Sequence, residues 1–237
     1  MSGHSKWSKI QRQKGVTDSR RGSLFTKHSK NITIAAKNGG DPTMNFSLRL
    51  AIDRAKQDNM PKDNIDKAIK KGTGELGSVN YEDVMYEGYA PGGVPIIIVG
   101  ITDNKNRTTP EVKAILSKNG GSLGAQNSVA WMFEHKGVIY IEDAKVKEKD
   151  ELMLELLDTG ADDVAEEDGL TIYTTFENFE NVKKFLDTKN IDTDYSEIEW
   201  VAKDKMEVDD SRGEKIQKII DLLEEHDDVN AVYSNLN

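Results

Sequence analysis

The chain has 237 residues, of which 36% are hydrophobic and 31% are charged, and its formal net charge is -10. This length allows one to three domains with a sizeable core. The absence of cysteine excludes disulfides, thiolate metal sites and cysteine nucleophiles. No apolar run approaches the roughly 18 residues that a membrane span needs, so we expect a cytoplasmic protein without a secretory signal.

The charge is divided unevenly along the chain. Residues 1–74 hold 16 Lys/Arg and 6 Asp/Glu, a net of +10, whereas the remaining 163 residues hold 16 and 36, a net of -20. The first 37 residues carry nine Lys/Arg against one acid, Asp18, with Trp7 among them. A charge run is usually a solvated helix face, but the length of this one, its shortage of acids and its tryptophan favour a docking surface for a polyanion.

The N-terminal third is expected to be helical after a flexible basic arm at 1–17. Apolar periodicity predicts a bundle of three short helices, at 18–38, 45–57 and 61–71. Asp18 is a suitable N-cap, and Pro61 suits the first turn of the third helix. A glycine-rich linker follows at 72–80.

From Tyr81 the apolar period becomes that of strands. Two strands are predicted at 81–90 and 94–102, and the second should be central in a sheet because nearly all of its residues are apolar. A polar loop is expected next at 102–108, then a helix that has Pro110 in its first turn and ends at about Lys118. A strand is predicted at 128–134.

Residues 138–201 show a β-α-β-β-α-β alternation, which is typical of a ferredoxin-like domain. The last 33 residues add only a helix at 211–225 and a strand at 229–233, which cannot bury a core alone. We therefore predict an α+β multidomain fold in which the N-terminal three-helix bundle precedes two α/β domains, the ferredoxin-like one inserted into the other. The predicted domains are a basic helical domain at 1–77, a discontinuous α/β middle domain at 78–134 plus 205–237, and a ferredoxin-like domain at 135–204.

The sequence lacks the motifs of catalysis and metal binding. It has no P-loop, no G-x-S-x-G and no H-E-x-x-H, and no two of its four histidines share a local metal-ligand spacing. A G-x-G-x-x-G match at Gly72 follows a helix rather than a strand, which argues against a dinucleotide site. We therefore expect no enzyme activity, no cofactor, no metal and no small-molecule substrate.

The candidate nucleic-acid-binding residues are cationic or stacking side chains of the N-terminal domain. Lys and Arg neutralise phosphates, and Trp7 and His4 are suited to stack on an unpaired base. The full set is His4, Lys6, Trp7, Lys9, Arg12, Lys14, Arg20, Arg21, Lys27, Lys30, Lys67, Lys70 and Lys71.

A secondary loop site combines Glu87, Asn104, Asn106 and Arg107. Ordinary turn chemistry explains the two asparagines, and Glu87 and Arg107 are suited to form a structural ion pair.

Several long motifs resemble the YebC/PmpR family, which includes a mitochondrial translational activator of cytochrome c oxidase. The motifs are GHSKW at 3–7, DSRRGSLFTK at 18–27, NMPKDNIDKAIKKGTGE at 59–75, YEGYAPGGVPIIIV at 86–99 and TDNKNRT at 102–108. The resemblance implies three domains and a non-enzymatic cytoplasmic protein. It implies either a DNA-binding transcriptional regulator or a ribosome-associated factor that aids translation through proline runs.

We therefore predict a nucleic-acid-binding regulator of gene expression, with DNA or ribosomal RNA as its partner and no membrane association. The alternative is a translation factor that binds ribosomal or transfer RNA and relieves stalling. A third hypothesis is a protein-interaction module that uses the acidic domains while the basic arm is only a solubilising tail.

Overall fold

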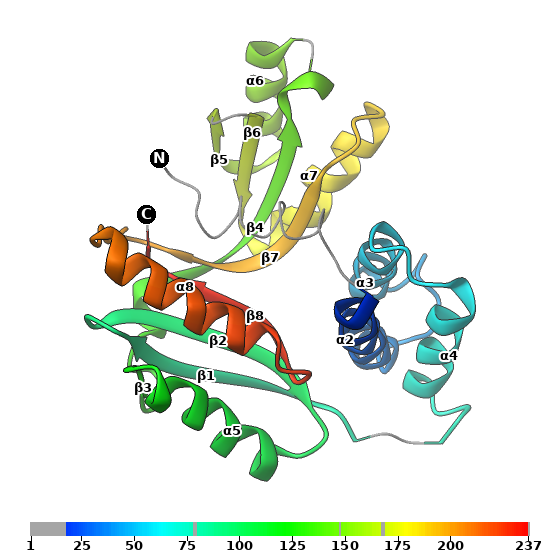
Figure 1. The fold of residues 1–237 in the computed structure, drawn as a ribbon. Helices are drawn as coiled ribbons and strands as arrows, with labels where there is room; N and C mark the ends of the chain where they lie inside the picture. The colour runs from blue at the N-terminus through cyan, green and yellow to red at the C-terminus, as the bar shows by residue number, and fades with distance from the viewer. Residues whose placement is uncertain (1–17, 78–79, 147, 167–168, 237) are drawn as a thin grey trace. The chain divides into compact units, whose positions relative to one another are not determined.

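A computed structural model describes residues 18–77, 80–146, 148–166 and 169–236. They form two compact units, Met132–Asp204 and a larger unit made of 18–131 with 205–236 (Figure 1). The fold is mixed α+β, with one four-stranded antiparallel sheet in each unit. Among the described residues, no helix is both long and apolar enough to cross a membrane.

The larger unit begins with three helices that share one apolar cluster. They are α2 (Asp18–Ala36), α3 (Phe46–Gln57) and α4 (Lys62–Gly72), and Ile32, Leu48 and Ile65 are among the buried residues between them. The Asn45 side chain accepts a hydrogen bond from the Leu48 amide and so caps α3. Gly72 allows α4 to approach α2 closely, because a Cβ at this position would collide with the Thr33 carbonyl.

The sheet of the larger unit has the strand order β3-β1-β2-β8. Its strands are β1 (Glu82–Ala90), β2 (Val94–Thr102), β3 (Ser122–Leu123) and β8 (Val229–Ser234). Strand β2 lies between β1 and β8, and eight of its nine residues are buried, as its apolar composition predicted. Helices α5 (Lys105–Lys118) and α8 (Asp210–Glu224) pack Leu116 and Ile219 onto Ile96 and Ile98 in one buried cluster.

Several of the predicted elements differ from the structure. Helix α5 starts at Lys105, so Pro110 lies beyond its first turn, because Asn104 caps the helix by accepting a hydrogen bond from the Arg107 amide at 3.2 Å. The prediction of a strand at 128–134 is wrong for residues 128–132, and the strand predicted at 138–142 begins already at Phe133. The chain instead forms a short 3-10 turn, η1 (Ala130–Met132), since the Glu87 carboxylate takes the backbone N–H groups that a strand would use.

The smaller unit follows the order β4-α6-β5-β6-α7-β7 and has the strand order β5-β6-β4-β7. Its elements are β4 (Phe133–Glu142), η2 (Asp143–Lys145), α6 (Lys149–Thr159), β5 (Ala161–Glu166), β6 (Gly169–Thr174), α7 (Phe176–Thr188) and β7 (Tyr195–Ala202). Gly137 on β4 leaves room for the Phe179 ring of α7, which a Cβ would meet. Both ends of the unit lie side by side, because the Lys203 amide donates to the Met132 carbonyl at 3.0 Å.

We predict that deleting residues 205–237 unfolds the sheet of the larger unit and leaves the smaller unit folded. The deletion removes β8, which pairs with β2, and α8, which buries Ile216, Ile219 and Leu223. Backbone amide spectra of the truncated protein should keep the dispersed signals of 135–204 and lose those of 78–134.

The matching control is a fragment of residues 78–134 alone. We propose that these residues and 205–237 form one discontinuous domain between a basic domain at 1–77 and an inserted ferredoxin-like domain at 135–204. A 78–134 fragment that unfolds cooperatively by itself contradicts this division.

Candidate nucleic-acid interface

The N-terminal part of the predicted interface lies outside the described residues. This applies to His4, Lys6, Trp7, Lys9, Arg12 and Lys14. Arg20 belongs to the first turn of α2, but only its backbone is described. The remaining candidates lie on α2 and α4, the two helices that are packed against each other.

Lys27 and Lys30 face the protein interior rather than solvent. The Lys30 nitrogen is 2.5 Å from Oδ1 of Asp228 and 2.8 Å from the Asp227 carbonyl oxygen, and the residue is only 7% exposed. Lys27 donates to the Glu224 carbonyl, and burial lowers its pKa to about 8 against the opposing effect of Glu224 and Asp227. These positions correct the expectation that both lysines bind phosphate.

Arg21, Lys67 and Lys70 are exposed, and Lys71 is half-buried. Lys67, Lys70 and Lys71 are three and four residues apart, so they share one side of α4. Lys70 and Lys71 occupy its last turn, where the helix dipole favours cations. Among the described residues, the exposed candidates therefore lie on one side of α4 and at the start of α2.

The secondary loop site has a structural explanation. Asn104 caps α5, and Arg107 donates from Nη2 to Asp103 at 2.9 Å and to Asp228 at 2.7 Å. Asn106 is exposed on the first turn of α5. Glu87 and Arg107 do not pair with each other. The Glu87 carboxylate accepts backbone hydrogen bonds instead, and the Arg107 guanidinium contacts Asp103 and Asp228.

The buried Glu87 side chain fixes the loop that precedes β4. Its carboxylate accepts three backbone hydrogen bonds, from Asn127 at 2.6 Å and from Val129 and Ala130 at 2.7 Å each. Burial alone would raise the pKa of Glu87, but these three N–H groups hold the pKa below its ordinary value. No local sequence pattern marks this contact, since its partners lie 40 or more residues away.

Asp228 was missed by sequence reasoning because it follows a helix in a short acidic turn that looks solvated. It is 2% exposed and accepts hydrogen bonds from Lys30, Arg107 and Thr108. Thr102 contributes a longer one at 3.2 Å. Burial alone would raise the pKa of Asp228, but the bonds from Lys30, Arg107 and Thr108 hold the pKa far below its usual range.

One face of α2 is thereby fastened to the turn between α8 and β8. Ser23, Lys27 and Lys30 are spaced four and three residues apart, which places them on a single side of the helix. Ser23 donates to Asp227 at 2.7 Å, beside the contacts of the two lysines. Asn230 on β8 donates to Asn31 at 2.7 Å. The basic helices and the sheet of the larger unit are thus joined by polar contacts.

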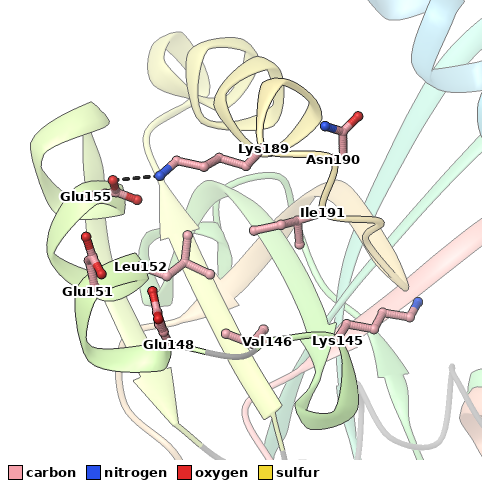
Figure 2. Close-up of a pocket in the computed structure, with 9 residues that line it drawn as sticks. All are labelled: Lys145, Val146, Glu148, Glu151, Leu152, Glu155, Lys189, Asn190 and Ile191. Atoms are coloured by element: carbon pink, nitrogen blue, oxygen red, sulfur yellow. Dashed lines mark hydrogen bonds and ion pairs between the residues drawn. The ribbon is translucent and has the colours of Figure 1, made fainter.

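The smaller unit contains a cavity of about 490 Å³ between the start of α6 and the end of α7 (Figure 2). Its floor is apolar and its rim is charged, and the lining residues include Val146, Leu152, Ile191, Glu148 and Glu151. Sequence reasoning gave no indication of this cavity. Within the described ranges, no three His, Cys, Asp or Glu side chains are grouped so that they could hold a metal ion.

Comparisons with known proteins cover nearly the whole chain. The family model described as the TACO1/YebC protein N-terminal domain matches residues 5–75, and the model of the TACO1/YebC second and third domain matches residues 81–236. A "Probable transcriptional regulatory protein" of Halothermothrix orenii is 50% identical over 239 residues, covering 99% of this chain and 94% of that protein. One of Treponema denticola is also 50% identical, over 238 residues, covering 100% and 96%.

A solved structure is similar over the same extent. The crystal structure of a conserved hypothetical protein, Aq1575, from Aquifex aeolicus superposes with a TM-score of 0.85 at 38% sequence identity. The match covers 100% of this chain and 96% of that one.

We predict that Asp228→Asn lowers the free energy of unfolding by about 3–5 kcal/mol, because it leaves the buried Lys30 ammonium without its counter-charge. The matched control is Asp103→Asn, which removes the other carboxylate that contacts Arg107 but lies at the surface. This control should leave stability almost unchanged. Urea denaturation of the two variants at neutral pH makes the comparison, and equal losses would contradict the role given to Asp228.

We predict that Glu87→Gln lowers the free energy of unfolding by about 1–3 kcal/mol at neutral pH. The amide is a weaker hydrogen-bond acceptor than the carboxylate, and its NH2 group would face backbone N–H donors. The folded-state pKa of Glu87 is lowered, so its contribution is complete above the pKa of an unfolded glutamate, about 4.3. The contribution is lost as the pH falls through the lower folded-state value. The stability difference between the two proteins should therefore shrink below about pH 4.

The control on the same strand is Glu82→Gln, since Glu82 is half-exposed and pairs with Lys105. It should match the original protein at each pH. A Glu87→Gln deficit that stays constant from pH 7 to pH 3 contradicts the assignment of a charged, hydrogen-bonded carboxylate.

Proposed function

Because the chain belongs to the TACO1/YebC family, whose curated relatives are named probable transcriptional regulatory proteins, we propose that it is a nucleic-acid-binding regulator of gene expression. In this proposal the basic N-terminal end binds the nucleic acid. The protein acts in the cytoplasm, without catalytic turnover and without a cofactor.

The division of charge is the observation that carries the proposal. A net of +10 over residues 1–74 is opposed by -20 over the rest of the chain. A phosphate backbone is attracted to the first part and repelled by the second, which orients the bound molecule. The exposed Arg21, Lys67 and Lys70 extend the basic region onto the described helices.

The structure narrows the set of residues that the proposal uses. Lys27 and Lys30 are occupied by Glu224, Asp227 and Asp228, so they are left out of the phosphate contacts. The contacts that remain in the first helix and the arm are Lys6, Lys9, Arg12, Lys14, Arg20 and Arg21.

Two targets fit this surface. Duplex DNA and ribosomal RNA both present phosphates, and the resemblance to translation factors keeps a ribosome-associated role as the alternative. Nothing in the sequence marks a major-groove reader, which favours recognition of RNA or of shape. Sedimentation of a cell lysate, with and without ribonuclease or deoxyribonuclease, distinguishes association with ribosomes from association with chromosomal DNA.

We expect the affinity for nucleic acid to fall with salt at a log–log slope of roughly -4 to -5, because about six phosphate contacts each release counterions. In Arg20→Gln/Arg21→Gln the slope should become shallower by about 1–2 units. Fluorescence anisotropy of a labelled duplex DNA and of a labelled structured RNA, titrated between 50 and 200 mM salt, measures both slopes.

Two further variants serve as controls. Lys183→Gln/Lys184→Gln removes the same charge from α7 in the smaller unit and should leave the slope unchanged. Trp7→Ala should weaken binding with little effect on the slope, since stacking releases no counterions. An unchanged slope in the Arg20/Arg21 variant contradicts the proposal and favours the hypothesis in which the acidic domains bind a protein.

A further inference from the structure

We propose that the smaller unit docks a basic, amphipathic segment of another protein on the outer side of α6. The docking surface consists of the exposed Leu154 and Leu157 and, beyond Glu151, the cavity with Glu148 at its rim and Val146, Leu152 and Ile191 at its floor. This partner is separate from the nucleic acid of the proposed function and would engage the opposite sign of charge.

Two leucines of α6 are exposed at positions where polar side chains would be expected. Leu154 and Leu157 are 66% and 45% exposed. They are three residues apart on α6, so they form one apolar strip on its surface. Leu152 and Leu156 already supply the inward face of this helix, and both are buried. The two exposed leucines therefore add nothing to the core of the unit, and exposed apolar strips with polar rims are typical of interaction sites.

The second observation is the cavity beside this strip. Glu151 belongs to its rim and lies three residues before Leu154, so the cavity meets the strip at Leu154, whereas Leu157 lies further round the helix. Figure 2 shows Leu152 and Ile191 facing the hollow between the two helices. The apolar floor of the cavity is suited to the aliphatic stem of a lysine or arginine.

The third observation is the state of the charges at the rim. Lys189 is held by Glu155 at 2.6 Å (Figure 2), and Lys145 is held by Asp194 at 2.6 Å. Glu148 and Glu151 have no partner among the described residues, and both are exposed. An incoming ammonium or guanidinium group over the apolar floor would meet these two carboxylates.

The net charge of the smaller unit favours a cationic partner. Met132–Asp204 holds 21 Asp/Glu and 8 Lys, with no arginine, a net of -13. Such a surface repels nucleic acid and attracts cationic protein segments. An apolar strip next to unpaired carboxylates is complementary to a helix that carries leucines on one side and lysines along its border.

The test uses the full-length protein and a fluorescent 18-residue helical peptide made of leucine and lysine, with the leucines on one face. A second peptide has serine in place of every leucine. We expect Leu154→Ser/Leu157→Ser to weaken binding of the first peptide by roughly tenfold or more. Glu148→Gln/Glu151→Gln should weaken it several-fold at low salt and reduce its salt dependence. The serine peptide should bind at least tenfold more weakly than the leucine peptide.

Matched variants separate this site from general attraction to an acidic protein. Phe176→Ser removes an equally exposed apolar side chain, and Glu177→Gln/Asp204→Asn removes two exposed acids elsewhere in the unit. Both should bind like the original protein. Arg20→Gln/Arg21→Gln should also bind the peptide normally, so failure of the nucleic-acid proposal and failure of this one give different results.

Backbone amide shifts supply the site-specific readout. They should change along α6 and at 189–191 when the leucine peptide is added. Equal binding of both peptides, or an unchanged affinity in Leu154→Ser/Leu157→Ser, would overturn the inference. So would self-association of the intact protein that these two substitutions abolish, because the surface would then serve a second copy of the chain.

Discussion

The Asp228 carboxylate is removed from water, so the protein itself has to supply its counter-charges and hydrogen bonds. The donors come from three places in the chain: Lys30 on α2, Thr108 and Arg107 on α5, and Thr102 at the end of β2. The full set of contacts is made only when the helical region, the sheet and the C-terminal turn are all in place. The buried Asp228 charge is therefore fully compensated only when the larger unit is assembled.

The same contacts divide the cations of the basic end into two kinds. Lys27 and Lys30 lie on the side of α2 that faces the C-terminal turn, and their charges are used inside the protein. Lys67 and Lys70 are exposed, and their charges lie at the surface. Composition alone treats all of these residues alike, whereas burial decides which are available to a phosphate. The acidic smaller unit, in turn, exposes the apolar strip of α6 to solvent.

The sequence predicted most helices and strands because their signals are local. Asn45 and Pro61 mark helix starts, and the apolar run of β2 identifies a strand buried on both faces. The errors arose where a distant side chain decides the backbone. Glu87 draws residues 127–130 out of a strand, and no window of neighbouring residues contains that information.

The candidate site was less predictable than the fold for the same reason. Charge division along the chain is a sum over the sequence and needs no structure. To distinguish the buried Lys30 from the exposed Lys67, one must know where Asp228 lies in the fold, and Asp228 is 198 residues away from Lys30 in the sequence. The cavity beside α6 could not be predicted from the sequence, because it is formed by the packing of α6 and α7, which are separated in the chain by the hairpin of β5 and β6.

The position of β8 at the far end of the chain has a consequence during synthesis. Strand β2 ends at Thr102, but the partner that covers its outer edge does not begin until Val229. At typical rates of chain elongation the ribosome needs on the order of 6–25 s to make the intervening residues. During that interval an almost wholly apolar strand has an open edge, which is a template for pairing with other chains. Until β8 is made, the nascent chain is therefore open to edge-to-edge pairing at β2.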